Sequence, residues 1–258
     1  MTATSLVQVK AVEPGVVRLT LNRPEQRNAL SIALMEELCR AVQTIEKDAS
    51  ARVLILAGAG LSFCAGLDLK EAARDLELAE KGAQRVARVL KTIHQSRLVT
   101  IAAIHGAVMA GGAGLMSACD LVVAAQDTRI GYPEVRRGLV AGLVLHFLLR
   151  QVGDRMARQL LLTGESIMAD EAARIGLINQ VVPVDTQLTA ALELARQVLK
   201  GAPQAIARTR QLIEELGPRD LNDDLQRALE HHMAARRSDE AKEGMAAFAQ
   251  KREPVWHP

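Results

Sequence analysis

Hydrophobic and polar positions follow a strand pattern and then a helix pattern near the start of the chain. Residues 16–21 alternate, so that their apolar side chains share one face of a predicted strand: Val17, Leu19 and Leu21. A helix is predicted after Asn28, its N-cap, and it ends near Lys47. Apolar residues three and four positions apart form the inward face of this helix: Met35, Leu38, Val42 and Ile45.

Three short runs, apolar except for Thr100, have the pattern of strands buried on both faces: residues 53–56, 100–104 and 121–125. A helix is predicted between the first two, with four residues facing inward: Val86, Val89, Leu90 and Ile93. Between the last two lies GAVMAGGAGLMSACD, a glycine turn followed by a short helix. Strand and helix therefore alternate, which predicts an α/β fold with a parallel sheet built from right-handed crossovers.

The pattern changes after about residue 184, where only helices are predicted: 188–200, 203–216, 221–236 and 239–251. We therefore predict an α/β core over residues 1–190 and a C-terminal helical region over residues 191–258. Helices that carry apolar stripes but have no core of their own need a partner surface. We expect these helices to pack on the core or on another subunit, and we expect an oligomer.

Composition excludes several classes of function. The chain has 32 basic and 30 acidic residues, which argues against an electrostatic nucleic-acid clamp. We find no apolar run of signal-peptide or membrane-spanning length, and neither metal-ligand spacing nor a dinucleotide fingerprint. Cys39, Cys64 and Cys119 form no CxxC pair, which is typical of buried thiols in a reducing compartment. These observations favour a cytoplasmic protein that binds no nucleic acid, membrane or metal.

Two glycine-containing turns follow predicted strands and are candidate anion sites. The first is SFCAGLDLKEA, residues 62–72, and the second contains Ala110, Gly111 and Gly112. Glycine lets main-chain N–H groups approach a ligand, and a following helix adds the positive end of its dipole. Two such N–H groups that point at one oxygen would form an oxyanion hole. From the spacing alone, plain tight turns are the simpler interpretation.

The order of these segments resembles the crotonase superfamily of enoyl-CoA hydratases and isomerases over nearly the whole chain. The matching segments are LNRPEQRNAL (21–30), SFCAGLDLKE (62–71), residues 105–120, GYPEVRRGL (131–139), residues 161–183 and KEGMAAFAQKREP (242–254). The resemblance implies a crotonase-like spiral of ββα units. It also implies C-terminal helices used in trimerisation, giving a homotrimer or a dimer of trimers.

The resemblance also implies the residues of an acyl-CoA site. The oxyanion hole falls on the main-chain N–H groups of Leu67 and Gly111, and the general acid–base role falls on Glu134. Further contacts with the CoA ester fall on Arg27, Ala29, Ala65, Gly66, Asp68, Leu69, Gly112, Pro133, Leu139 and Lys251. Coenzyme A enters as part of the acyl-CoA substrate, and no other cofactor is implied.

The chain departs from the family pattern at Gly114, where hydratases commonly have a second glutamate. A single carboxylate can still shuttle a proton, which on chemical grounds favours double-bond isomerisation. A glycine here also occurs in sequences that resemble methylglutaconyl-CoA hydratases, which favours hydration of a branched enoyl-CoA. We place hydration slightly ahead. Isomerisation, decarboxylation, thioester cleavage and non-catalytic acyl-CoA binding remain alternatives.

Other reactive side chains are given structural roles. We interpret His105 as a hydrogen-bonded core or loop residue, and His232 as part of a surface pair with its neighbour His231. Asp120 is expected to cap a helix or pair with a cation, and Tyr132 either lines the acyl pocket or packs in the core. If Glu134 is buried beside an apolar pocket, its pKa should rise, as suits a proton shuttle.

Overall fold

The computed structural model describes residues 5–73, 76–216 and 220–255. Its centre is a six-stranded sheet with the order β1-β2-β3-β4-β6-β9. The strands are β1 (Val7–Glu13), β2 (Val16–Leu21), β3 (Val53–Gly58), β4 (Val99–Ile104), β6 (Leu121–Ala125) and β9 (Gln180–Val182). β1 is antiparallel to β2, and the other neighbours are parallel. The predicted parallel sheet is confirmed, and β1 and β9 extend it at its two edges.

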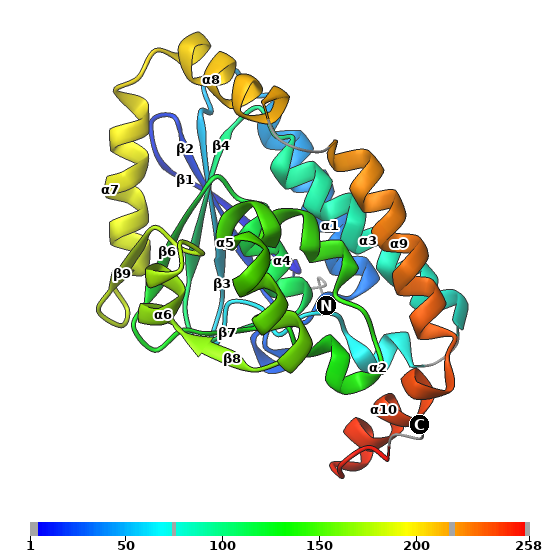
Figure 1. The fold of residues 1–258 in the computed structure, drawn as a ribbon. Coiled ribbons are helices and arrows are strands. Elements are labelled where there is room, and N and C mark those ends of the chain that lie inside the picture. The colour runs from blue at the N-terminus through cyan, green and yellow to red at the C-terminus, as the bar shows by residue number, and fades with distance from the viewer. Residues whose placement is uncertain (1–4, 74–75, 217–219, 256–258) are drawn as a thin grey trace.

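Apolar residues fill both faces of this sheet, as the apolar runs predict. In β3, Leu54 and Leu56 join the larger core, and Val53 and Ile55 join the smaller one on the opposite face. Figure 1 shows α7 on one side of the sheet and α1 and α3 on the other. These helices are α1 (Ile32–Glu46), α3 (Leu76–His94) and α7 (Gln187–Leu199). The predicted inward faces of α1 and α3 are buried in the larger core.

A smaller sheet lies beside the large one and has the order β5-β7-β8. Its strands are β5 (Ala107–Met109), β7 (Arg129–Gly131) and β8 (Ser166–Met168). The chain thus runs from a strand of the large sheet to a short strand and then to a helix, as in β4, β5 and α4 (Gly111–Ser117). This repeated path is the predicted spiral of ββα units, and its short strands were not apparent from the sequence.

The start of α1 differs from the prediction. Ser31, not Asn28, is the N-cap, because its hydroxyl oxygen accepts a main-chain N–H of the first turn at 3.2 Å. Asn28 has a φ of 54° and serves the preceding loop. Its Oδ1 accepts from the N–H of Arg23 at 2.8 Å, and its Nδ2 donates to the carbonyls of Ala59 at 2.9 Å and Ser62 at 2.8 Å. Asparagine tolerates this left-handed conformation, so Asn28 fixes the loop before the helix.

The C-terminal helices cover the core of the same chain. The remaining helical elements are α2 (Leu69–Ala72), α5 (Gly142–Thr163), α6 (Ala169–Arg174), α8 (Pro203–Glu215), α9 (Leu221–Arg236), α10 (Asp239–Gln250) and the 3-10 helices η1 (Pro24–Gln26) and η2 (Pro133–Arg137). α9 packs on α3 and α5, and α10 packs on η2. α7 packs on β3, β4 and β6, so the predicted division at residue 190 falls inside this helix. The use of the later helices in trimerisation stays a prediction.

Candidate active site

The fold brings the two glycine-containing turns together by pairing their strands. The N–H of Phe63 donates to the carbonyl of His105 at 2.9 Å, and the N–H of Met109 donates to the carbonyl of Cys64 at 3.0 Å. Residues 62–64 therefore extend the small sheet beside β5. Residues 65–67 follow one of these paired segments and residues 110–111 follow the other, so the first turn lies next to the N-terminus of α4.

The main-chain amides of Leu67 and Gly111 are close neighbours in these turns. Each follows a residue with positive φ, namely 93° at Gly66 and 50° at Ala110. A Cβ added at Gly111 would lie 3.8 Å from the nitrogen of Leu67, and one added at Gly66 would lie 3.5 Å from the nitrogen of Gly111. Within the described residues neither N–H donates a hydrogen bond. Both residues line one cavity, so both amides are available to a ligand there.

Glu134 is a buried carboxylic acid in the wall of the same cavity. It lies on η2, and the residue is 9% exposed. Its Oε2 is buried and has no hydrogen-bond partner in the described part of the chain. Burial raises the pKa of Glu134 from 4.5 to about 7, against the opposing charge of Arg137. This carboxyl group can therefore both accept and donate a proton near neutral pH.

Gly114, the position at which the family resemblance implies a second glutamate, is tightly packed. A Cβ at Gly114 would lie 2.7 Å from Val144 Cγ1 and 3.4 Å from Leu90 Cδ2. The helices α4, α5 and α3 meet at this glycine, and a Cβ there would require the side chain of Val144 to shift. Gly114 thus lies at a close contact between three helices, and the departure from the family pattern stays an implication of the resemblance.

The cavity has a volume of about 680 Å³ and contains eight of the predicted site residues in its lining: Arg27, Ala65, Leu67, Leu69, Gly111, Pro133, Glu134 and Leu139. These residues come from four separate segments of the chain. An apolar wall faces them, formed by α3 and α5 through Ala83, Val86, Leu143 and Val144. The lining therefore combines the two amides and an apolar wall with charged side chains such as Arg129, Arg136 and Glu165.

Five predicted residues are not in the lining of this cavity: Ala29, Gly66, Asp68, Gly112 and Lys251. Asp68 pairs with Arg23 at 3.1 Å and caps α2, so its carboxylate is used within the protein. A Cβ at Gly112 would lie 2.3 Å from the carbonyl oxygen of Cys64, so this glycine permits close backbone packing. Lys251 is an exposed residue at the C-terminal end of α10.

Several lining residues were missed because they come from distant helices or were given other roles. His232 of α9 is buried, not a surface residue, and its Nδ1 lies 3.0 Å from the carbonyl oxygen of Val140. Phe248 of α10 also lines the cavity. Tyr132 is fully buried and packs in the core, without lining the cavity. The only signal for Phe248 was a large apolar residue on a C-terminal helix, which does not indicate what it contacts.

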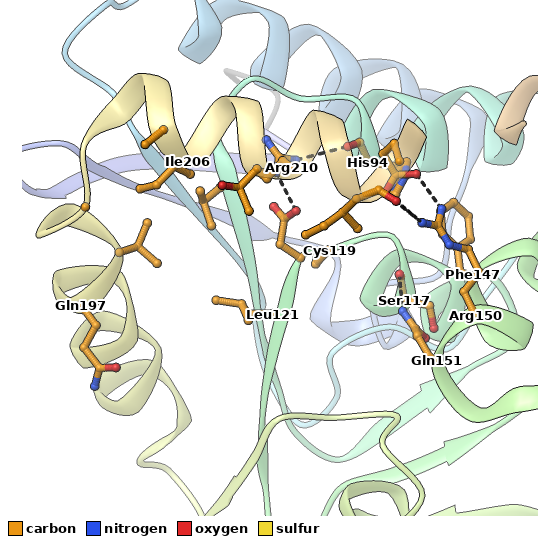
Figure 2. A pocket seen from close by; sticks show the side chains of 18 of the residues that line it. His94, Ser117, Cys119, Leu121, Phe147, Arg150, Gln151, Gln197, Ile206 and Arg210 are labelled. Atoms are coloured by element: carbon orange, nitrogen blue, oxygen red, sulfur yellow. Dashed lines mark hydrogen bonds and ion pairs between the residues drawn. The ribbon is translucent and has the colours of Figure 1, made fainter. Parts of the chain in front are cut away.

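A second cavity, of about 760 Å³, lies under α8 (Figure 2). Its charged groups are paired with one another. Asp120 accepts from Arg210 at 2.8 Å, and Arg150 donates to Glu214 at 2.6 Å. Asp120 also accepts from the N–H of Thr100 at 2.7 Å, which confirms its predicted structural role. These pairs fasten α8 to the sheet and to α5, so this cavity is a structural junction, and the reactive groups lie in the other one.

A spiral α/β fold that presents two free amides beside a buried glutamate defines the crotonase class of proteins. Comparison with known proteins gives the same result. The family described as enoyl-CoA hydratase/isomerase matches residues 11–258. Enoyl-CoA hydratase EchA19 of Mycobacterium tuberculosis is 36% identical over 243 residues, covering 92% of this chain and 91% of its own. The 2,3-dehydroadipyl-CoA hydratase of Escherichia coli is 33% identical over 240 residues, covering 93% and 94%.

Solved structures extend the likeness to three dimensions. The crystal structure of an enoyl-CoA hydratase from Mycobacterium avium matches with a TM-score of 0.87 and 36% identity, covering 98% of this chain and 100% of that one. This chain belongs to the enoyl-CoA hydratase/isomerase family, and the predicted crotonase fold is confirmed. Among the described residues, the structure contains no helix long and apolar enough to cross a membrane.

Proposed function

We propose that the protein hydrates an enoyl-CoA thioester. The observation that carries this proposal is the free pair of amides at Leu67 and Gly111 in one cavity with Glu134. Amides fixed in this way stabilise negative charge as it develops on a thioester oxygen, because they need no reorganisation during the reaction. A carboxyl group with a pKa of about 7 is present in both protonation states at neutral pH.

In this mechanism one carboxylate handles both protons. Ionised Glu134 takes a proton from water as the water oxygen bonds to C3 of the enoyl group. The electron pair of the double bond moves to the thioester oxygen, which the N–H groups of Leu67 and Gly111 hold as an enolate. Protonated Glu134 then delivers its proton to C2, and the enolate returns to a thioester. The sum is the addition of one water molecule, and Glu134 is restored.

Double-bond isomerisation is the second candidate, and it is favoured because Gly114 supplies no second carboxylate. Isomerisation requires only that a base lift a proton from one carbon and return it to another. Glu134 could do this through the same enolate without ordering a water molecule. The names of the relatives favour hydration, because EchA19 and the Escherichia coli protein are both called hydratases.

The proposal includes features carried over from the family resemblance. CoA would contact the predicted residues along the first loop and the segment 65–69, and Lys251 would reach its nucleotide phosphates. The chains would form a homotrimer or a dimer of trimers, which agrees with large apolar side chains exposed on α8 and at its C-cap: Leu212, Ile213 and Leu216. Three buried, unpaired cysteines agree with a cytoplasmic location. Coenzyme A would be part of the substrate, with no separate cofactor.

Mass spectrometry of the products tests this function. The purified protein is incubated with crotonyl-CoA, methylglutaconyl-CoA and a 3-enoyl-CoA, and Glu134→Gln is the matched variant. Hydration adds the mass of one water, isomerisation leaves the mass unchanged and shifts the double bond, and decarboxylation removes carbon dioxide. If the wild type leaves every ester untouched, or if Glu134→Gln acts as fast as the wild type, the proposed function is wrong.

A further inference from the structure

Arg137 is a cation in the wall of the active-site cavity, and no carboxylate of the described residues forms an ion pair with it. Its side chain is half-buried, and its guanidinium lies over the ring of Phe248, with Cζ 4.4 Å from the ring centroid. Nη1 donates to the carbonyl of Pro133 at 3.4 Å, and Nε is buried without an acceptor. Nη2 has no hydrogen-bond partner in the described part of the chain. Burial lowers the pKa of Arg137, although an arginine of this kind stays charged.

The preceding residue, Arg136, differs from Arg137 because its guanidinium is paired with a carboxylate. Arg136 forms an ion pair with Glu165 and donates to the carbonyl of Thr163 at 3.0 Å. Among the described residues, the carboxyl group that acts electrostatically on Arg137 is that of Glu134, and the burial of Glu134 favours its neutral form. A partly desolvated guanidinium without a bound anion is unfavourable by itself, and it is a strong site for a ligand carboxylate.

The backbone fixes Arg137 on the side of the cavity that Glu134 faces. Both residues lie on η2, three positions apart, and side chains at this spacing in a 3-10 helix stand on the same face. One such turn separates them by about 6 Å along the helix axis. α10 holds this turn in place, since a Cβ at Gly244 would lie 2.4 Å from the carbonyl carbon of Arg137. Arg137 is therefore one helical turn away from the group that acts on the reacting carbons.

We propose that the substrate's acyl group ends in a carboxylate and that Arg137 binds it. This inference rests on the proposed function, because it assumes that the thioester oxygen lies at Leu67 and Gly111. The reacting carbons then lie beside Glu134, and the far end of a short acyl chain reaches Arg137 along the apolar wall formed by α3 and α5. Arg136 and Glu165, which also line the cavity, are paired with each other. A neutral acyl chain would leave the guanidinium without an anion. A dicarboxylic acyl group would supply that anion and two hydrogen-bond acceptors.

Binding of two saturated esters tests this inference without requiring turnover. Adipyl-CoA and hexanoyl-CoA have six-carbon acyl groups that differ in the terminal carboxylate. We expect isothermal calorimetry to give a Kd about 10- to 100-fold lower for adipyl-CoA, the size of a charge-assisted hydrogen bond. Arg137→Met should reduce this ratio to near one, and Arg137→Lys should retain part of it. Arg136→Met removes the same charge one position away and should keep the wild-type ratio.

Two results would overturn the inference. One is equal affinity of the wild type for the two esters, or a ratio that Arg137→Met leaves intact. The other is an equal loss of affinity for both esters and for free CoA in Arg137→Met, which would place a CoA phosphate on Arg137. Failure of the proposed function looks different. In that case an Arg137-dependent preference for adipyl-CoA would persist, while 2,3-dehydroadipyl-CoA and hexenoyl-CoA would both remain unreacted.

Discussion

Replacing Glu134 with glutamine should make the folded protein more stable at alkaline pH while it removes activity. The carboxyl group is buried with one oxygen unsatisfied, so its ionisation in the folded state is unfavourable. Glutamine has nearly the same shape and carries no charge at any pH. The variant should therefore avoid a cost that the wild type incurs whenever Glu134 is ionised.

The size of this effect follows from the pKa. Burial raises the pKa of Glu134 from 4.5 to about 7 in the folded protein. A raised folded pKa contributes stability that is fully present below the unfolded value of 4.5 and is lost as the pH rises through about 7. At about 1.4 kcal/mol for each unit, the wild type loses about 3.5 kcal/mol across this window relative to Glu134→Gln.

Urea unfolding at a series of pH values measures this difference directly. The advantage of Glu134→Gln over the wild type should grow from pH 5 to pH 8 and then stay constant. Glu165→Gln is the matched control: it removes an exposed carboxylate from the same cavity and should show no such growth. A difference between Glu134→Gln and the wild type that is the same at every pH would refute the reasoning that Glu134 is buried and protonates near neutrality.

Two substitutions and one pH profile test other parts of the site. Gly111→Pro removes one amide of the predicted oxyanion hole at a helix position that accepts proline, and it should lower kcat about 100- to 1,000-fold. The kcat/KM of the wild type should fall about tenfold per pH unit below pH 7, because the reaction starts from ionised Glu134. Gly114→Ala places a Cβ 2.7 Å from Val144 Cγ1 and should lower the free energy of unfolding by about 1 to 3 kcal/mol.

Each of these three predictions has a result that would contradict it, and each substitution also has a control variant. Gly111→Ala is the control for Gly111→Pro, because it also adds a Cβ, 3.1 Å from Leu30 Cδ1, but keeps the N–H. An equal loss of kcat in the two variants would mean that the amide of Gly111 is not used. A kcat/KM that stays flat down to pH 5 would exclude Glu134 as the base. Adding Val144→Ala to Gly114→Ala should recover stability, and no recovery would show that the Cβ contact is not the cause.

Local patterns were sufficient to predict the central layers of the fold. The apolar runs of β3, β4 and β6 and the helical spacing of α1 and α3 depend on burial, which hydrophobicity reports directly. β5, β7 and β8 were missed because three-residue strands are too short to show an alternation. α5 was missed as well, and its helix is interrupted at Gly153, where φ is 72°. The role of Asn28 depended on loop contacts that lie up to 34 positions away in the chain.

The site was predictable where a motif fixes the backbone and unpredictable where tertiary contacts decide. The glycine-containing turns, Pro133 and Glu134 lie in contiguous motifs, and the family resemblance located them by position. Arg137 and Phe248 meet only because α10 folds back onto η2. The close packing at Gly114 depends likewise on how α3 and α5 pack around α4. No pattern along one segment contains that information.

Proton exchange at C2 of a saturated acyl-CoA tests the central claim most directly, because it requires enolate formation and nothing else. Butyryl-CoA is incubated with the protein in deuterium oxide, and deuterium at C2 is followed by NMR. The amides of Leu67 and Gly111 together with Glu134 should give enzyme-dependent exchange that Glu134→Gln abolishes and Gly111→Pro reduces strongly. Exchange no faster than without protein, or equally fast in all three proteins, would contradict the account.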